Sequence, residues 1–322
     1  MMLSMVKALN DGMRHALEAD KRVLLIGEDI GRLGGVFRTT DGLQKDFGED
    51  RVVDSPLGEA GIVGSAIGLA MRGYRPVCEI QFDGFVYPAV NQIITQLAKI
   101  RHRSSGAVHL PVVIRIPFGG GIGSIEHHSE SPETYFAHTA GLKVVTCATP
   151  QDAYSMIRQA IASDDPTIFL EPKRRYWAKG DVTEAQDPPL DKARVVRPGN
   201  DITFIAYGPT VDTALQAADA AEAAGHSAEV IDLRSLSPLD TETVVSSVQR
   251  TGRALVVHEA SLSHGVGAEL AARVQHDAFY FLEAPVLRVT GYDTPYPPSK
   301  LEHDWLPNIE RILSATKRSF SY

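Results

Sequence analysis

We predict an α/β protein built from two doubly wound domains, on the basis of three observations. Short apolar runs alternate with amphipathic stretches along the chain, a pattern typical of parallel sheets covered by helices. The length of 322 residues exceeds what one hydrophobic core usually serves. From residue 179 to about residue 197 the periodicity is lost and Asp, Pro and Lys accumulate. We therefore expect a first domain over residues 1–180, a linker over 181–197 and a second domain over 198–322.

The first domain is expected to open with a helix from Met5 to Ala19 and a buried strand from Val23 to Ile26. That strand ends at Gly27-Glu28-Asp29, and the carboxyl end of a strand is where such sheets place ligand contacts. Further strands are expected at Val77–Ile80, Val112–Ile116, Val144–Val145 and Ile168–Leu170, with helices from about Pro88 to Arg101 and near Asp152–Ala162.

The second domain repeats the alternation. An Ala-rich helix is expected from Val211 to Ala224, stopped by Gly225, and a last helix follows an irregular tail near Pro295–Pro298 and Trp305–Pro307. Four strands are expected, at Ile202–Ala206, Ala228–Leu233, Ala254–Val257 and Val286–Val289.

Charge and composition narrow the class of protein. With 40 acidic against 32 basic side chains, the net charge of -8 disfavours nucleic acid or an anionic membrane as the main partner. Cys78 and Cys147 lie in apolar contexts without metal-type spacing, so we expect buried free thiols and a reducing compartment. No apolar run approaches the roughly 20 residues of a membrane span, and no signal-like segment opens the chain. We expect a soluble, cytoplasmic protein.

The segment from Ser55 to Ala70 carries one carboxylate, Glu59, in a helix of small and apolar residues that is expected to be buried. Pro56 suits the first helical position behind a Ser55 cap, and the repeated Gly, Ala and Ser let another element or a ligand approach the backbone. A capping box would need its Glu at position 58, which is Gly58. Since the capping register is off by one residue, we favour Glu59 as a catalytic acid over a helix-terminus charge partner.

Aromatic residues crowd the turn that follows the strand at Val77–Ile80. Phe82, Phe85 and Tyr87 either belong to the core or form a flat apolar wall for a heteroaromatic cofactor ring. Gln81 would then supply a polar contact.

A glycine-rich loop leads from Gly119 to the paired histidines His127 and His128. The glycines suit a backbone that approaches something closely, and the histidines can donate protons near neutral pH. A metal site with the nearby glutamates and a plain surface histidine pair are the alternatives. The run is not a phosphate loop, because it lacks the Lys-Ser/Thr ending and the strand-to-helix context.

Six segments, in this order and spacing, resemble the beta chain of the thiamine-diphosphate-dependent 2-oxo acid dehydrogenases. The resemblance runs from Met5 to the final helix. It implies a thiamine-diphosphate pyrimidine-binding domain followed by a transketolase C-terminal-like domain. The six segments are Gly27-Glu28-Asp29, Gly34-Gly35-Val36-Phe37-Arg38, Leu57-Gly58-Glu59-Ala60, Glu79-Ile80-Gln81-Phe82, His128-Ser129-Glu130-Ser131-Pro132-Glu133 and Leu170-Glu171-Pro172-Lys173.

The resemblance also implies roles for these residues. Glu59 would bond the aminopyrimidine ring of thiamine diphosphate and start the cycle, and His128 would handle protons near the lipoyl group or the substrate carbonyl. Phe82 would lie near the substrate, together with Phe85 and His128. The residues implied to contact the cofactor are Glu28, Leu57, Gly58, Glu59, Gln81 and Phe85.

One motif of thiamine enzymes is missing. They hold the diphosphate through magnesium and a Gly-Asp-Gly motif, which does not occur in this sequence. The family remedy is an alpha subunit that brings these ligands, in a tetramer of two alpha and two beta chains. The second domain would then serve assembly and the docking of a lipoyl-bearing acyltransferase core. We predict no metal ligands in this chain, and the resemblance leaves potassium binding open.

The substrate class is less sharply indicated. Ser131-Pro132-Glu133 and Phe136-Ala137-His138-Thr139 resemble the branched-chain 2-oxo acid enzyme of branched-chain amino acid degradation. Phe85 stands where many branched-chain members have Tyr, which resembles some bacterial pyruvate enzymes. We expect the branched-chain activity, with pyruvate dehydrogenase as the alternative. A transketolase-type enzyme and a non-catalytic scaffold subunit are further alternatives, but the first usually carries the diphosphate module and the second would have lost Glu59 or His128.

Overall fold

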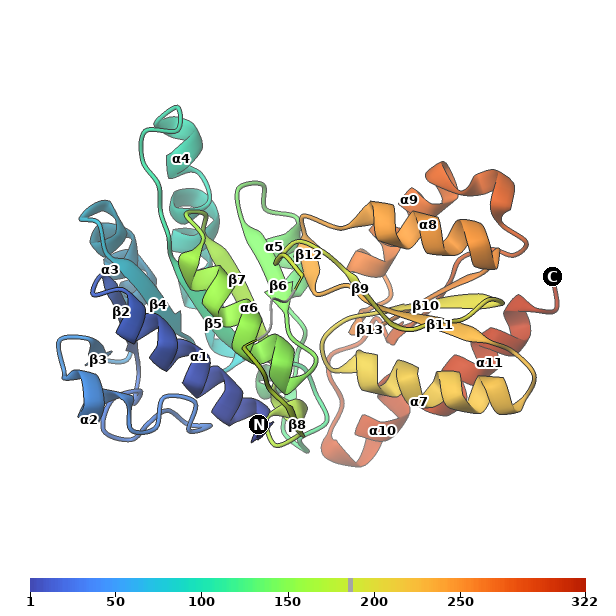
Figure 1. Cartoon of the computed structure of the whole chain (residues 1–322), viewed down its shortest axis with the longest axis horizontal. Coiled ribbons are helices and arrows are strands. Elements are labelled where there is room, and N and C mark those ends of the chain that lie inside the picture. The colour runs from blue at the N-terminus through green and yellow to red at the C-terminus, as the bar shows by residue number, and fades with distance from the viewer. Residues whose placement is uncertain (185–187) are drawn as a thin grey trace.

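The computed structural model describes residues 1–184 and 188–322 and confirms the predicted fold class (Figure 1). Helices cover both faces of two sheets, and the chain passes from the first sheet to the second (Figure 1). The larger sheet has seven strands in the order β12-β6-β7-β5-β4-β2-β3, parallel except for β12. Its strands are β2 (Val23–Gly27), β3 (Val52–Asp54), β4 (Arg75–Glu79), β5 (Val113–Phe118), β6 (Lys143–Thr146), β7 (Thr167–Pro172) and β12 (Ser235–Ser237).

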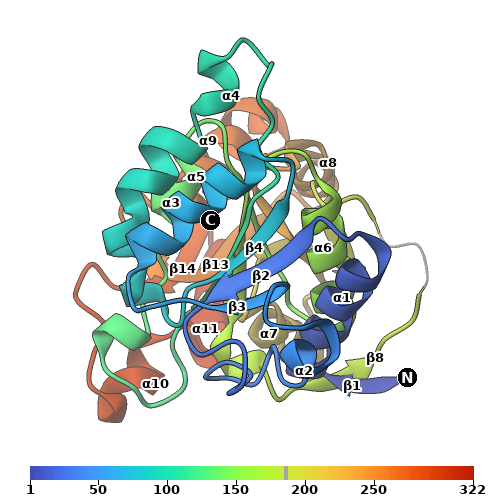
Figure 2. The ribbon, with the colours of Figure 1, turned by 90° about the vertical axis from the view of Figure 1, so that its left-hand side faces the viewer.

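Two layers of helices enclose this sheet. The helices α1 and α6 pack on one face, and α3 lies on the other (Figure 2). Side-chain caps begin two of them, because Ser4 accepts the Lys7 N–H before α1 and Thr149 accepts the Asp152 N–H before α6. The helices of the first domain are α1 (Met5–Ala19), α2 (Leu43–Phe47), α3 (Glu59–Met71), α4 (Ile100–Arg103), α5 (Glu133–Ala137) and α6 (Pro150–Ala162).

The second sheet has five strands in the order β14-β13-β10-β11-β9. The helices α7 and α11 lie on one face and α8 and α9 on the other (Figure 1). The strands are β9 (Arg194–Arg197), β10 (Ile202–Ala206), β11 (Ala228–Asp232), β13 (Ala254–Ser261) and β14 (Leu287–Gly291). The helices are α7 (Thr210–Ala223), α8 (Thr241–Thr251), α9 (Val266–Asp277), α10 (Glu302–Trp305) and α11 (Ile309–Ser319).

The segment predicted as a linker contains regular structure at both ends. β8 (Lys179–Asp181) pairs with β1 (Met2–Ser4), and β9 pairs antiparallel with β11 of the second sheet. By contrast, β12 comes from the second half of the chain and extends the first sheet beside β6. Among the described strands, β12 thus joins the sheet of the other domain, which sequence periodicity alone does not reveal. Residues 185–187 lie outside the described part of the chain.

The predicted start of the Glu59 helix is wrong. The helix α3 begins at Glu59 with Gly58 as its N-cap, and residues 55–58 form a loop. The Ser55 N–H is bonded to the Gly27 carbonyl, which holds this loop to the end of β2. The Ser55 hydroxyl is buried without a hydrogen-bond partner among the described residues, so it caps no helix.

The helix predicted from about Pro88 to Arg101 is confirmed as helical chain, but it is irregular and divides into three pieces. A 3₁₀ turn covers Tyr87–Ala89, a π-helix covers Gln92–Leu97, and α4 follows separately. π-helical segments are rare in proteins, and those that occur often lie at functional sites. Elsewhere, the expected buried state of Cys78 and Cys147 is confirmed, and both are free.

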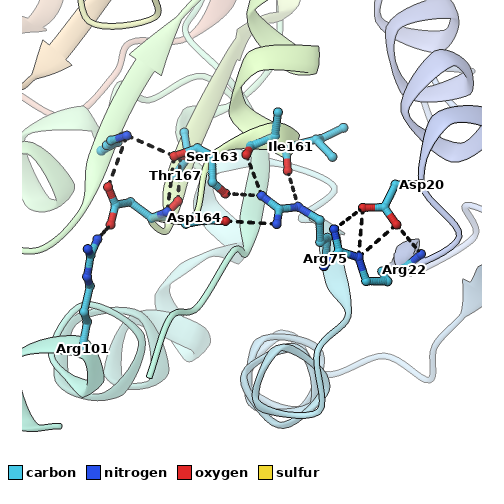
Figure 3. Close-up of polar contacts among 11 residues, drawn as sticks. Asp20, Arg22, Arg75, Arg101, Ile161, Ser163, Asp164 and Thr167 are labelled. Atoms are coloured by element: carbon cyan, nitrogen blue, oxygen red, sulfur yellow. Dashed lines mark hydrogen bonds and ion pairs between the residues drawn. The ribbon is translucent and has the colours of Figure 1, made fainter. Parts of the chain in front are cut away.

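Arg75 closes the amino-terminal edge of the larger sheet (Figure 3). Its guanidinium donates to the carbonyls of Ile161 (2.9 Å), Ala162 (2.7 Å) and Ser163 (2.8 Å) and forms an ion pair with Asp164. Because the last turn of α6 has no basic residue of its own, this cation satisfies the free carbonyls and the negative end of the helix dipole. These contacts therefore stabilise the amino-terminal ends of the strands, opposite to Glu28 and Glu59.

The glycine-rich loop after β5 is fastened by the second domain. The Gly120 N–H donates to Glu259 (2.9 Å), and the Gly121 N–H donates to Glu302 (2.8 Å) and to the Tyr296 hydroxyl (3.1 Å). A Cβ at Gly120 would overlap the Tyr296 hydroxyl. The prediction of a close backbone approach is confirmed, and what approaches is the second domain.

In the described chain, no helix is both long and apolar enough to cross a membrane.

Gly120→Ala is predicted to destabilise the chain by about 1–3 kcal/mol, because the added methyl group forces Tyr296 or the loop to shift. Urea unfolding of the purified chain measures this loss. The control is Gly61→Ala on α3, where a Cβ meets open space and removal of a helical glycine stabilises by up to about 1 kcal/mol. Equal unfolding free energies for the two variants would contradict the interdomain contact.

Candidate active site

The predicted site residues gather at the carboxyl ends of adjacent parallel strands. Glu28 directly follows β2, Glu59 lies five residues beyond the end of β3 at Asp54, and Gln81 follows β4. The loop with His128 follows β5, the neighbour of β4 in the sheet. In α/β sheets this edge is where ligands bind, because the loops there converge.

The two acids Glu28 and Glu59 lie side by side. Glu28 is 7% exposed, and its Oε1 accepts the Gly58 N–H at 3.0 Å. Burial raises the pKa of Glu28, as do the nearby Glu59 and Asp29, whereas the Gly58 bond lowers it. Glu28 therefore fixes the loop that presents Glu59 as the first, partly exposed residue of α3.

Gln81 joins this acidic group from β4. Its Nε2 donates to Asp29 Oδ2 at 3.1 Å and, more weakly, to the Glu28 carbonyl at 3.4 Å. The amide is therefore held on the same side as Glu28. Leu57, in the loop between the two acids, is 87% exposed and extends from the surface.

Phe82, Phe85 and His128 form an aromatic cluster between the turn after β4 and the loop after β5. The ring centroids of Phe82 and His128 are 4.1 Å apart, and those of Phe85 and His128 are 5.2 Å apart with the rings at 79°. Phe82 also packs edge-on against Phe37 at 5.3 Å, from the loop after β2. Phe82 and Phe85 are partly buried, and Phe85 also packs against the hydrophobic core, so the cofactor wall stays a prediction.

His128 has one ring nitrogen in an unusual state. Its Nδ1 is buried and has no hydrogen-bond partner among the residues that the structure describes. Burial lowers the pKa of His128, and the neighbouring His127 and Lys173 lower it further against the opposing effect of Glu126. The lowered pKa favours the neutral imidazole near pH 7, and its buried Nδ1 is shielded from solvent.

Beneath the site, Arg115 joins three strands through two buried ion pairs. Its NH1 donates to Glu79 on β4 at 2.5 Å, and its Nε donates to Glu171 on β7 at 2.6 Å. Burial works against the charge of Arg115, yet Glu171 and Glu79 raise its pKa overall. Tyr176 donates to Glu171 at 2.7 Å and completes the network.

Sequence reasoning missed the role of these charges and of a second buried pair, Asp83 with Lys173. The signal was present, because Glu79 and Arg115 interrupt runs that otherwise predict buried strands. A charge in the middle of a buried parallel strand requires an opposite charge on a neighbouring strand.

The site lies on an open face of this chain. Two cavities of about 870 and 1030 Å³ lie elsewhere, and none of the predicted site residues lines either of them. The face of α3 formed by Gly61, Ser65 and Gly68 is exposed, contrary to the expectation of a fully buried helix. Among the described residues, no group of three His, Cys, Asp or Glu side chains is placed to hold a metal ion.

Two family models cover most of the chain. Residues 1–178 match the transketolase pyrimidine binding domain, and residues 191–312 match the transketolase C-terminal domain. A solved structure titled as a split gene transketolase in an inactive beta4 tetramer superposes with a TM-score of 0.83 and covers 99% of this chain and 98% of its own. At 20% sequence identity, that likeness shows the fold alone.

Curated relatives match over nearly the full length. The pyruvate dehydrogenase E1 component subunit beta of Leifsonia xyli is 61% identical, with 99% of this chain and 95% of that protein covered. The 3-methyl-2-oxobutanoate dehydrogenase subunit beta of Mycobacterium tuberculosis is 55% identical, covering 98% and 91%. The 2-oxoisovalerate dehydrogenase subunit beta of Pseudomonas aeruginosa is 46% identical, covering 98% and 94%. Domains and relatives together place this chain in the family of beta subunits of the thiamine-diphosphate-dependent 2-oxo acid dehydrogenases.

Proposed function

We propose that this chain supplies the pyrimidine-binding half of a thiamine diphosphate site, with Glu59 as the acid that activates the cofactor. The observation that carries the proposal is the position of Glu59 at the start of α3, on the loop that the buried Glu28 holds through the Gly58 N–H, at the same ends of the strands as Gln81 and Phe82. These residues fit the pyrimidine part of the cofactor, because an acid can bond a ring nitrogen and the rings can cover an apolar face.

The residues of this chain divide the work. When bound, thiamine diphosphate supplies the carbon nucleophile that adds to a 2-oxo acid and allows carbon dioxide to leave. Glu59 holds and returns the proton of the aminopyrimidine ring, while Glu28 and Gln81 fix the loop and the ring edge. Phe82 and Phe85 exclude water from the reacting atoms. His128 donates a proton when the acyl group passes to a lipoyl group.

We further propose an alpha subunit that brings magnesium and the diphosphate ligands, in a tetramer of two alpha and two beta chains. The amides of Gly120 and Gly121 support this proposal, because they donate to the second domain and are not free for a phosphate. The exposed stripe Gly61, Ser65 and Gly68 on α3 would let the partner approach the backbone closely.

The second domain would dock the lipoyl-bearing acyltransferase core. Three consecutive aromatic side chains after α9 support this part of the proposal. Phe279 is 56% exposed, Tyr280 95% and Phe281 52%, and contiguous exposed apolar groups of this kind mark interaction sites.

For the substrate we propose branched 2-oxo acids of the 2-oxoisovalerate type. The sequence from Ser131 to Thr139 supports this choice, and so do the relatives that carry this activity in their names. Pyruvate is the second candidate. It is favoured by Phe85, whose ring lies against His128, and by the relative of 61% identity named a pyruvate dehydrogenase subunit.

Glu59→Gln is predicted to preserve the fold and partner binding but to slow cofactor activation by about 100-fold to 10,000-fold, because an amide cannot exchange the required proton. The measurement is deuterium exchange of the thiazolium proton in the tetramer with its alpha subunit. Near-normal exchange in the variant would refute the role of Glu59.

His128→Ala is predicted to impair acyl transfer more than decarboxylation, because the proton donor is needed in the later step. Lipoyl acylation is compared with decarboxylation followed by an artificial electron acceptor. Equal losses in both assays would assign His128 to substrate binding. Unchanged rates in both would leave it as a surface residue of the loop.

Branched 2-oxo acids are predicted to react with higher kcat/KM than pyruvate. Each additional methylene in an apolar pocket contributes about 1–3 kcal/mol, so the preference is graded and not absolute. Turnover of 2-oxoisovalerate and pyruvate by the co-expressed alpha and beta chains decides between the two candidates. A higher kcat/KM for pyruvate would select the second one.

A further inference from the structure

A buried ion pair lies directly behind the aromatic wall. Asp83, in the turn after β4, is completely buried, and Lys173, in the turn after β7, is 2% exposed. The Lys173 ammonium bonds Asp83 Oδ1. Removing two charges from water is costly, so such a pair in a loop region needs a reason beyond stability.

The pair fastens both ends of the loop that carries His128. Asp83 Oδ2 accepts the Glu130 N–H at 2.8 Å, just after the histidine. The Lys173 ammonium lies 3.5 Å from the Pro117 carbonyl oxygen, on the strand from which the loop departs. The fit is tight between these points, because a Cβ at Gly84 would overlap the His127 carbonyl oxygen.

The Phe82 ring contacts both the Lys173 ammonium and His128. Lys173 Nζ lies 5.6 Å from the centroid of Phe82, and Phe82 in turn packs against His128 at 4.1 Å. A cation at this distance interacts favourably with the ring quadrupole. The positive charge is thereby kept one side chain away from the imidazole.

We propose that Asp83 and Lys173 are positioning residues for the acyl-transfer step: they fix the loop that carries His128 and hold a positive charge behind Phe82. This inference rests on the proposed function of His128. The pair acts through the histidine and does not touch the substrate.

The electrostatic consequence concerns the histidine. The charged or titratable groups that face His128 are His127 and Lys173, which lower its pKa, and Glu126, which raises it. Burial has the largest effect and also lowers the pKa of His128. Removing the Lys173 charge therefore raises the pKa of the imidazole, and its protonated form persists to higher pH.

The test uses the tetramer with its alpha subunit and three variants: Asp83→Asn, Lys173→Met and the double variant. Each single change leaves one buried group without its partner, whereas the double change removes both charges and keeps an amide oxygen for the Glu130 N–H. The single variants are expected to lose about 10- to 100-fold in lipoyl acylation, because small displacements of a reacting group are costly. Decarboxylation with an artificial acceptor should fall less.

The double variant is expected to recover much of the thermal stability and the acylation rate. Its pH profile of kcat/KM for acylation should nevertheless move, with the limb assigned to the histidine at higher pH than in the unaltered protein, because the Lys173 charge that lowers the His128 pKa is gone. This readout does not depend on whether the single variants fold. A double variant with an unshifted profile would overturn the proposed effect of the Lys173 charge.

Two controls separate the possible failures. Glu229→Gln breaks the ion pair with Arg250 in the second domain, so it should lower stability without changing the ratio of the two assays or the pH profile. If the single variants lower both assays equally, as a purely structural pair would, the positioning role is refuted. His128→Ala in the same assays tests the proposed function itself: a normal acylation rate there refutes the role of His128, independently of the Asp83 and Lys173 results.

Discussion

The site depends on one buried guanidinium. Arg115 on β5 bonds Glu79 on β4 and Glu171 on β7, so the three strands are joined just before their carboxyl ends. From these ends depart the turn with the aromatic wall, the loop with His128 and the turn with Lys173. Because breaking one member of a buried ion network leaves an uncompensated charge, the relative positions of the strands are strongly fixed. This network therefore fixes the positions of the loops that carry the candidate site residues.

The second domain completes the loop geometry from the other side. The glycine-rich segment leads to His128. Its backbone N–H groups donate hydrogen bonds to Glu259, Tyr296 and Glu302. The histidine loop is thus held by the first domain at Glu130 and by the second at its glycines. This arrangement explains the glycines at 119 and 120, since Glu259 and Tyr296 of the second domain occupy the space that a Cβ would take. The second domain therefore helps to hold the loop that carries His128 in place.

Much of the fold followed from the sequence, because hydrophobic periodicity reports strands and helices. The predicted site residues lie at the carboxyl ends of the strands, where such sheets bind ligands, and their roles stay predictions. Periodicity fails where a tertiary contact decides. The sequence predicts Ser55 as a helix cap. In the structure the Gly58 N–H bonds Glu28, and α3 begins only at Glu59. The strand β9 lies inside the predicted linker. It was missed because it forms through its pairing with β11, which the local sequence pattern does not show. Lys173 stood inside a recognised motif, yet its partner Asp83 lies 90 positions away, and no local pattern connects the two.

We propose above that this chain provides one half of a shared thiamine diphosphate site. The most direct test is calorimetric titration of thiamine diphosphate and magnesium into the purified chain, first alone and then with its alpha subunit. We expect weak or undetectable binding by the chain alone and tight, magnesium-dependent binding after mixing, together with a higher thermal stability of the loaded complex. Tight, magnesium-dependent binding by the chain alone would contradict this proposal.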